Sequence, residues 1–241
     1  MKIFVTGGAG FIGKHLSKLL ANQNHQITIF DNFSNSSRDG LADSENGKIT
    51  IVKGDILNVE DILKNLPGHD VVIHLAAKIS VNESIKNPEE TFQVNVKGTE
   101  NILNASIENN VKRIFAFSSA AIYGNNKNRN HSSKENDDTI SISPYGESKI
   151  RMEREILRIC KDGKTIATIF RLFNVYGKGQ TKEYAGVISK FSENIKGGKP
   201  ITIYGNGEQT RDFIAIEDIV NLIGKIIKFD LGKNDEIYNL G

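Results

Sequence analysis

The chain has 241 residues, of which 38% are hydrophobic and 25% charged, proportions typical of a globular protein that can bury a full core. Its 31 basic and 29 acidic residues give a formal net charge of +2 and are spread along the chain, so neither nucleic acid nor a membrane surface is expected as a partner. The single cysteine, Cys160, excludes an internal disulfide and fits a reducing compartment. No apolar run approaches the roughly 20 residues that cross a bilayer, so we expect a soluble, cytoplasmic protein.

Short apolar runs rich in Ile, Val and Phe alternate with segments whose apolar residues recur every three or four positions. The short runs predict buried strands at residues 2–6, 26–30, 49–53, 70–76, 113–119 and 165–173. The longer segments predict helices at residues 11–23, 59–66, 88–110 and 143–161. This alternation predicts an α/β fold, a doubly wound parallel sheet with right-handed crossovers.

The pattern changes near residue 175. We expect a helix at 184–198, two strands around an Asn206–Gly207 turn within 201–214, a further helix at 216–229, and a strand-like end at 238–241. This tail predicts a small second region beside the sheet. We therefore divide the chain into a dinucleotide-binding domain at 1–174 and a smaller region at 175–241.

A glycine-rich loop, TGGAGFIG, separates the first strand from the first helix. Gly7, Gly10 and Gly13 allow a tight turn and a close approach of the backbone to a pyrophosphate, and the helix N-terminus supplies N–H donors and a positive dipole. Asp31 ends the next strand about 20 residues on, where a carboxylate can bind an adenosine ribose and repel a 2′-phosphate. This favours NAD over NADP as cofactor, although Arg38 leaves NADP open.

Tyr145 and Lys149 are four residues apart in SPYGESK, so a helix places them on one face. We expect the ammonium and a bound nicotinamide to lower the pKa of the phenol, so that the phenolate can accept a hydroxyl proton. Ser118 and Ser119 end a central strand at the edge where ligands bind in this architecture, and one hydroxyl could hold the reacting oxygen. An exposed polar pair and a serine that merely closes a strand are the structural alternatives.

The order of these motifs resembles that of the extended short-chain dehydrogenase/reductases. The chain is most similar to the NAD-dependent epimerase/dehydratase branch, and within it to the UDP-glucose 4-epimerases. The segments that carry the resemblance are TGGAGFIG (6–13), DNFS (31–34), GDI (54–56), HLAA (74–77), NVKGT (95–99), SSAAIYG (118–124), SPYGESK (143–149), RLFNVYG (171–177) and TRDFI (210–214). It implies a Rossmann-type fold with a small, apparently truncated C-terminal substrate-binding region for a nucleotide sugar.

The resemblance also implies a role for particular residues. The catalytic group would be Ser119, Tyr145 and Lys149. The NAD-binding residues would be Gly7, Gly10, Phe11, Ile12, Gly13, Asp31, Asn32, Asp55, Ile56, Leu75, Ala76, Ala77, Asn95, Tyr145, Lys149 and Phe173. The substrate-binding residues would be Ser119, Asn174, Val187, Thr202, Tyr204 and Arg211, and no metal is expected. Relatives also imply a homodimer through the helices at 88–110 and 143–161.

Ala120 and Ala121 help to distinguish between the reactions that enzymes of this branch catalyse. Dehydratases of this branch resemble STDEVYG where this chain has SSAAIYG, so Ala120 and Ala121 replace an acid and a base. Alanine cannot transfer a proton, whereas epimerisation needs only a base, bound NAD and room for a 4-keto sugar to rotate, a step that the resemblance alone implies. We therefore expect a UDP-glucose/UDP-galactose type 4-epimerase, with another nucleotide-sugar enzyme of the family, a non-catalytic NAD-binding protein, or a reductase that releases its cofactor as alternatives. Which sugar is bound is not fixed by the sequence.

Overall fold

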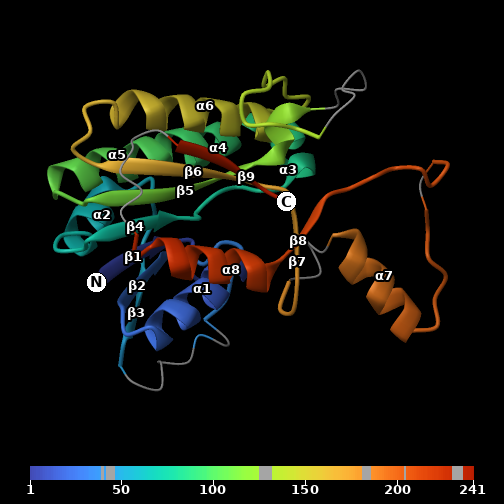
Figure 1. Cartoon of the computed structure of the whole chain (residues 1–241), viewed down its shortest axis with the longest axis horizontal. Helices are drawn as coiled ribbons and strands as arrows, with labels where there is room; N and C mark the ends of the chain where they lie inside the picture. Colours follow the sequence, from blue (N-terminus) through green and yellow to red (C-terminus); the bar gives the residue numbers. More distant parts are fainter. Residues whose placement is uncertain (39–40, 42–46, 125–131, 181–185, 204, 230–235) are drawn as a thin grey trace.

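Seven parallel strands form the central sheet in the computed structural model, which describes residues 1–38, 41, 47–124, 132–180, 186–203, 205–229 and 236–241. The strand order is β3-β2-β1-β4-β5-β6-β9, with all strands parallel (Figure 1). The bounds are β1 Lys2–Thr6, β2 Gln26–Asp31, β3 Ile49–Lys53, β4 Val71–His74, β5 Arg113–Ser119, β6 Ile166–Leu172 and β9 Glu236–Leu240. The expected Rossmann-type doubly wound sheet is confirmed.

Alternation along each strand divides the core between the two faces of the sheet. In β1, Ile3 and Val5 contribute to one buried cluster and Phe4 to the other. Helices α1 (Phe11–Asn22) and α8 (Ile216–Ile226) cover the Ile3 face, and α2 (Val59–Asn65), α5 (Gly98–Glu108) and α6 (Pro144–Ile159) cover the Phe4 face (Figure 1). Both faces are therefore covered by helices, as a parallel sheet requires.

The helix expected at 88–110 is interrupted. It consists of α4 (Pro88–Phe92), a π-helical turn at Gln93–Lys97, and α5. A short helix, α3 (Val81–Lys86), precedes it and was not predicted, because its only buried side chain is the polar Ser84. Asn87 lies between α3 and α4, where its side chain accepts a hydrogen bond from the Glu90 N–H, and Pro88 starts α4.

The region after residue 174 differs from the expectation. The predicted hairpin within 201–214 is wrong, because β8 (Phe213–Ala215) pairs in parallel with β7 (Asn174–Tyr176) and the described part of 201–212 contains no strand. Between them, α7 (Val187–Lys196) extends away from the sheet (Figure 1). The strand-like end is confirmed as β9, which joins the main sheet beside β6. The sheet thus includes a strand from beyond residue 174, and the division of the chain by function stays a prediction.

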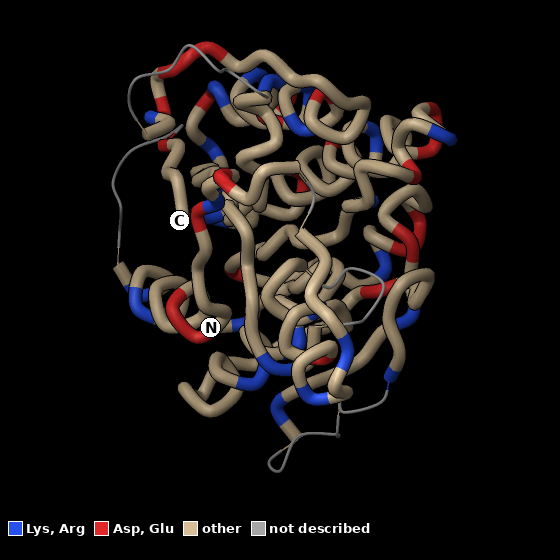
Figure 2. The backbone as a smooth tube through the Cα atoms, turned by 90° about the vertical axis from the view of Figure 1, so that its right-hand side faces the viewer, with Lys and Arg blue, Asp and Glu red and all other residues tan. Residues whose placement is uncertain are grey.

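Figure 2 shows basic and acidic positions interspersed along the backbone. Among the described residues, no helix has the length and apolar character to cross a membrane.

Candidate active site

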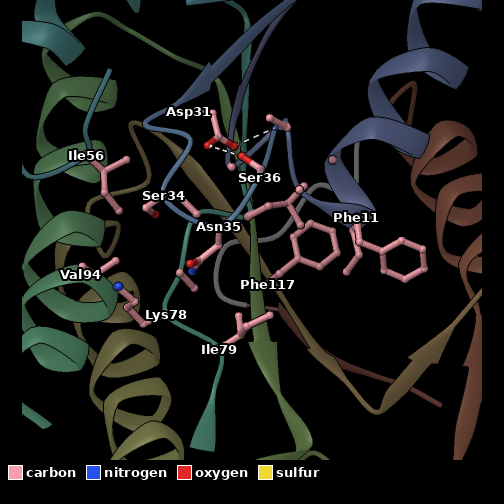
Figure 3. A pocket seen from close by; sticks show the side chains of 18 of the residues that line it. Phe11, Asp31, Ser34, Asn35, Ser36, Ile56, Lys78, Ile79, Val94 and Phe117 are labelled. Carbon is pink, nitrogen blue, oxygen red and sulfur yellow. Dashed lines mark hydrogen bonds between the residues drawn. The ribbon is translucent and has the colours of Figure 1, made fainter. Parts of the chain in front are cut away.

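The carboxyl ends of β1, β2, β4, β5 and β6 border one cavity of about 430 Å³. Its walls come from the glycine loop, from the segments after β2 and β4, and from α6. Figure 3 shows Asp31 and Ser36 close together, with Ile56, Val94 and Lys78 along one wall and Phe11 opposite them. The cavity is bordered by most of the expected cofactor and catalytic residues: Gly7, Gly10, Phe11, Ile12, Gly13, Asp31, Asn32, Asp55, Ile56, Leu75, Ala76, Ala77, Ser119, Tyr145, Lys149 and Phe173.

The three loop glycines have different physical roles. Gly7 adopts a positive φ of 66°, and a Cβ there would lie 2.6 Å from the Ala76 nitrogen. A Cβ on Gly13 would lie 2.5 Å from the Gly8 Cα, so the first turn of α1 packs directly on the loop. A Cβ on Gly10 would have only the Gly7 oxygen nearby, at 3.2 Å, although Gly10 borders the cavity. Gly7 and Gly13 are therefore needed for the fold, and Gly10 keeps the helix N-terminus accessible to a ligand.

Asp31 connects the glycine loop to the loop after β2. Its Oδ2 accepts a hydrogen bond from the Ala9 N–H at 3.0 Å, and its Oδ1 accepts from the Phe33 N–H at 2.8 Å and from the Ser36 hydroxyl at 3.0 Å. Nearby, Asn32 donates to Asp55 at 2.9 Å. These bonds hold both carboxylates at the wall of the cavity.

Several residues that border the cavity were not among the predicted site residues: Ser34, Asn35, Ser36, Ser37, Lys78, Ile79, Val94 and Phe117, among others. The polar stretch after β2 gave a signal for the four loop residues, because loops at this edge of a parallel sheet often bind ligands. The apolar Ile79 and Val94 carried no signal of this kind.

Helix α6 begins at the site because its N-terminus is capped. The Ser143 hydroxyl accepts a hydrogen bond from the Gly146 N–H at 3.1 Å, and Pro144 occupies the first turn, where it needs no partner. The Tyr145 N–H donates to the Ser84 hydroxyl at 3.1 Å. Tyr145 and Lys149 then lie on the buried face of α6, with 9% and 3% of their surfaces exposed. The alternative of an exposed polar pair is therefore wrong.

The pKa of Tyr145 differs in direction from the expectation, and the pKa of Lys149 is also shifted. Burial raises the pKa of the Tyr145 phenol, and a hydrogen bond with Ser119 acts in the opposite direction. Burial lowers the pKa of Lys149 to about 8, and attraction to the Glu153 carboxylate raises it. The lowering of the Tyr145 pKa that was expected from Lys149 together with a bound nicotinamide is not found for the protein alone, because desolvation of the phenolate is the largest effect. The Lys149 ammonium donates to the Phe117 carbonyl at 2.9 Å.

Asn95 lies behind the cavity and not in its wall. Its amide donates to the Lys78 carbonyl and the Ser148 hydroxyl, both at 2.9 Å, and its oxygen accepts from the Lys78 N–H at 2.8 Å. Ser148 in turn donates to the Tyr145 carbonyl at 2.6 Å. Asn95 therefore joins the segment after β4 to the first turns of α6; it was expected among the NAD-binding residues, and that role stays a prediction.

The expected substrate-binding residues after Phe173 that the structure describes do not border the cavity. Asn174 donates to the Asp212 carbonyl at 2.7 Å, and Arg211 is exposed and donates to its neighbour Thr210 at 2.7 Å. Val187 and Thr202 are also exposed, and Tyr204 lies outside the described residues. Of the predicted substrate set, the described structure brings Ser119 alone to the cavity.

The residues present fit a dinucleotide. Ser118 is 3% exposed, borders the cavity, and its hydroxyl has no hydrogen-bond partner among the described residues. A buried hydroxyl without a partner costs about 1–3 kcal/mol, so a polar ligand group is the expected partner. The N-terminus of α1 offers N–H donors to a pyrophosphate, and Ile56 and Val94 offer an apolar wall to a base.

Comparisons with known proteins agree with this fit. Residues 3–241 match the model of the NAD dependent epimerase/dehydratase family. The chain is 36% identical over 243 residues to a putative UDP-glucose 4-epimerase of Methanocaldococcus jannaschii, covering 99% of this chain and 76% of that protein. It is 34% identical over 250 residues to a UDP-N-acetyl-alpha-D-glucosaminuronate decarboxylase of Bacillus cytotoxicus, covering 100% of this chain and 74% of the relative.

A solved structure is also similar over the whole chain. The UDP-glucose 4-epimerase of Thermus thermophilus in complex with NAD has a TM-score of 0.87 and 28% identity, covering 100% of this chain and 78% of that one. Together with the family match over residues 3–241, this similarity identifies the chain as a member of the NAD dependent epimerase/dehydratase family.

Proposed function

We propose that this protein is an NAD-dependent nucleotide-sugar 4-epimerase of the UDP-glucose/UDP-galactose type. The observation that carries the proposal is the meeting of Ser119, Tyr145 and Lys149 at one cavity, with Ala120 and Ala121 directly after Ser119. The three polar groups suit oxidation and reduction at a hydroxyl-bearing carbon. The two alanines leave no carboxylate beside Ser119 for the removal of water.

NAD would be held by the glycine loop, by Asp31 and Asn32, by Asp55 and Ile56, and by the segment Leu75–Ala77. When bound, oxidised NAD supplies a hydride acceptor and a positive charge close to the catalytic group. The Asp31 carboxylate favours an unmodified adenosine ribose over a 2′-phosphate. Arg38 lies over the Phe33 ring at 5.3 Å, an arrangement that does not require a phosphate partner.

Tyr145, Ser119 and Lys149 would each have a different role in the reaction. Tyr145 would accept the proton of the sugar 4-hydroxyl and return it after the 4-keto sugar has rotated in the site. Ser119 accepts a hydrogen bond from the Ala121 N–H at 3.2 Å, which directs its own hydroxyl proton toward Tyr145 or the reacting oxygen. Lys149 would contribute a buried positive charge one turn from Tyr145, which together with the charge of bound NAD would favour the phenolate over the phenol. We propose a cytoplasmic location, because a sequence with one cysteine contains no internal disulfide and suits a reducing compartment.

Proton NMR of the anomeric region tests the reaction. The chain is incubated with NAD and UDP-glucose, and separately with UDP-N-acetylglucosamine. We expect a new 4-epimer signal that disappears in Tyr145→Phe and persists in the matched control Tyr238→Phe, whose ring lies 38% exposed outside the cavity.

Other products would overturn the assignment. A 4-keto-6-deoxy sugar would identify a dehydratase, loss of the sugar carboxylate from a uronate substrate a decarboxylase, and steady consumption of NADH a reductase. Binding of NAD without conversion of any nucleotide sugar would favour a non-catalytic NAD-binding protein.

We also propose a homodimer formed through α4, α5 and α6. These helices lie together on one side of the sheet (Figure 1), and the Arg151 guanidinium lies 4.7 Å from the centre of the Phe92 ring, which joins α6 to α4. Light scattering after size exclusion tests this proposal, and a monomeric mass at micromolar concentration would contradict it.

A further inference from the structure

A third ionisable side chain follows Tyr145 and Lys149 on the same face of α6. Glu153 is one further turn along the helix, and 5% of its surface is exposed. Its carboxylate forms two hydrogen bonds with Arg171 on β6, from Nε at 3.1 Å and from Nη2 at 2.8 Å. Arg171 is itself 4% exposed. The phenol and the ammonium at the cavity wall are thus followed by the carboxylate and the guanidinium, which lie outside that wall.

Arg171 is held in place by more than Glu153. Its Nη1 donates to the Tyr123 hydroxyl and to the Glu135 carbonyl, both at 2.8 Å. The Tyr123 hydroxyl donates in turn to Asn239 on β9 at 2.7 Å. A guanidinium with partners on this many sides cannot swing away from Glu153, so the position of the carboxylate relative to α6 is fixed.

A buried ion pair of this kind is a weak source of stability. Two charges lose their hydration, and apolar replacements of similar volume are often as stable. On the same helix, Glu147 and Arg151 pair at 3.0 Å while both remain exposed, at no such cost. Stability therefore does not explain why Glu153 is buried, whereas an ionisable neighbour whose charge Glu153 stabilises would explain it.

Lys149 is that neighbour. Lys149 interacts electrostatically with Glu153 on α6 and with His74 on β4, while Tyr145 lies one turn earlier on the same helix and Arg171 on β6 bonds Glu153. Burial lowers the pKa of His74 to about 3, so His74 is neutral at physiological pH and adds no charge. Burial also lowers the pKa of Lys149, and of these groups it is Glu153 that raises it.

We propose that the Glu153–Arg171 pair is a positioning unit for Lys149, in which Arg171 holds the Glu153 carboxylate one turn behind the ammonium and so keeps Lys149 charged and directed at the Phe117 carbonyl. Any effect of this positioning unit on catalysis rests on the function proposed above for Lys149. The role itself concerns the state of Lys149 and can be measured without any substrate.

The direct test is a pH titration of the Lys149 side chain by nitrogen-15 NMR of the full chain, with its signal assigned by its absence in Lys149→Met. We expect a midpoint near pH 8 in the unsubstituted protein. In Glu153→Gln the midpoint should fall by about one pH unit or more, because the attraction is lost while Arg171 remains. Glu153→Asp should restore part of the shift, and the exposed-pair control Glu147→Gln should leave the midpoint unchanged.

A double variant covers the case in which Glu153→Gln alone does not fold. Glu153→Gln with Arg171→Met removes both charges and leaves none unpaired, and its Lys149 midpoint should still lie below that of the unsubstituted protein. An unchanged midpoint in the folded Glu153 variants would overturn the proposal.

Measurement of the pH–rate profile beside the NMR midpoint distinguishes a failure of this proposal from a failure of the proposed function. If both are correct, the alkaline limb of the pH–rate profile moves to lower pH in Glu153→Gln, as the NMR midpoint does. A shifted midpoint in a protein that converts no nucleotide sugar would overturn the proposed function and support the positioning unit. Epimerisation with an unshifted midpoint and an unshifted alkaline limb would overturn the positioning unit alone.

Discussion

Replacement of Lys149 by methionine should stabilise the fold while abolishing activity. The pKa of Lys149 falls from an ordinary value of 10.5 to about 8 in the folded protein, a difference of about 2.5 units. At about 1.36 kcal/mol per unit, the buried ammonium costs about 3 kcal/mol at pH 7. Methionine loses the hydrogen bond to the Phe117 carbonyl, which offsets about 1 kcal/mol. We expect a net gain of about 2 kcal/mol in the free energy of unfolding.

The pH dependence identifies the cause of this gain. Below pH 8 both the folded and the unfolded chain carry a protonated Lys149, and the whole cost is present. Between pH 8 and pH 10.5 the folded protein has released the proton and the unfolded chain has not, so the cost fades as the pH rises. The advantage of Lys149→Met should therefore be largest at pH 7 and small near pH 10.

Urea denaturation at pH 7 and pH 10, followed by circular dichroism, measures both values. The exposed Lys225 on α8 provides the control, and Lys225→Met should change the stability by no more than about 0.5 kcal/mol at either pH. A Lys149→Met protein that is less stable at pH 7, or whose advantage does not depend on pH, would refute the electrostatic reasoning.

Two further predictions concern the cavity wall. Gly10→Ala should weaken NAD binding at least about tenfold in calorimetry and lower stability by less than about 1 kcal/mol, whereas Gly13→Ala should lower stability by about 2 kcal/mol or more, because its Cβ meets backbone at 2.5 Å. Equal effects of the two on melting temperature would contradict this. Ser118→Ala should raise the stability of the ligand-free protein by about 1 kcal/mol and weaken NAD binding, because the hydroxyl lacks a partner in the described structure. A lower melting temperature would contradict it.

The central sheet could be predicted because its strands are buried on both faces. Segments such as 2–6 and 113–119 are nearly continuous apolar runs, and helical segments follow them in regular alternation. Once the strands are parallel, their carboxyl ends share one edge, so Gly7, Asp31 and Ser119 must come together although they are far apart in sequence. This part of the candidate site follows from topology.

The C-terminal segment could not be predicted in the same way. The Asn206–Gly207 dipeptide is a local turn signal, and the flanking isoleucines suggested two strands around it. In the structure Ile203 is 62% exposed, and β8 instead pairs with β7, about 40 residues earlier in the chain. Strand pairing depends on which partner is available in space, and local propensity does not contain that information.

The state of Tyr145 shows a second limit. The spacing to Lys149 predicted a shared helix face correctly, yet in the protein alone the pKa of Tyr145 is raised and not lowered, because burial of the phenol depends on packing around the start of α6. One contact there comes from Ser84 on α3, a helix that sequence periodicity did not indicate. Charge spacing can be read from a sequence, whereas desolvation requires the surrounding elements.

The raised pKa of Tyr145 sets a condition on its proposed role as a base, and this condition follows from the net charge of the buried group formed by Tyr145, Lys149, Glu153 and Arg171. With Tyr145 neutral, Lys149 positive, and Glu153 and Arg171 cancelling each other, the group carries a single net positive charge, to which the neutral His74 adds nothing. Release of one proton makes the group neutral, the state that a low-dielectric interior favours. That proton can leave from the phenol or from the ammonium. Glu153 opposes release from the ammonium, yet the pKa of Lys149, about 8, still lies below that of the buried phenol, so without a ligand the ammonium releases its proton first. The proposed role of Tyr145 as a base would therefore depend on the additional positive charge that bound NAD would supply.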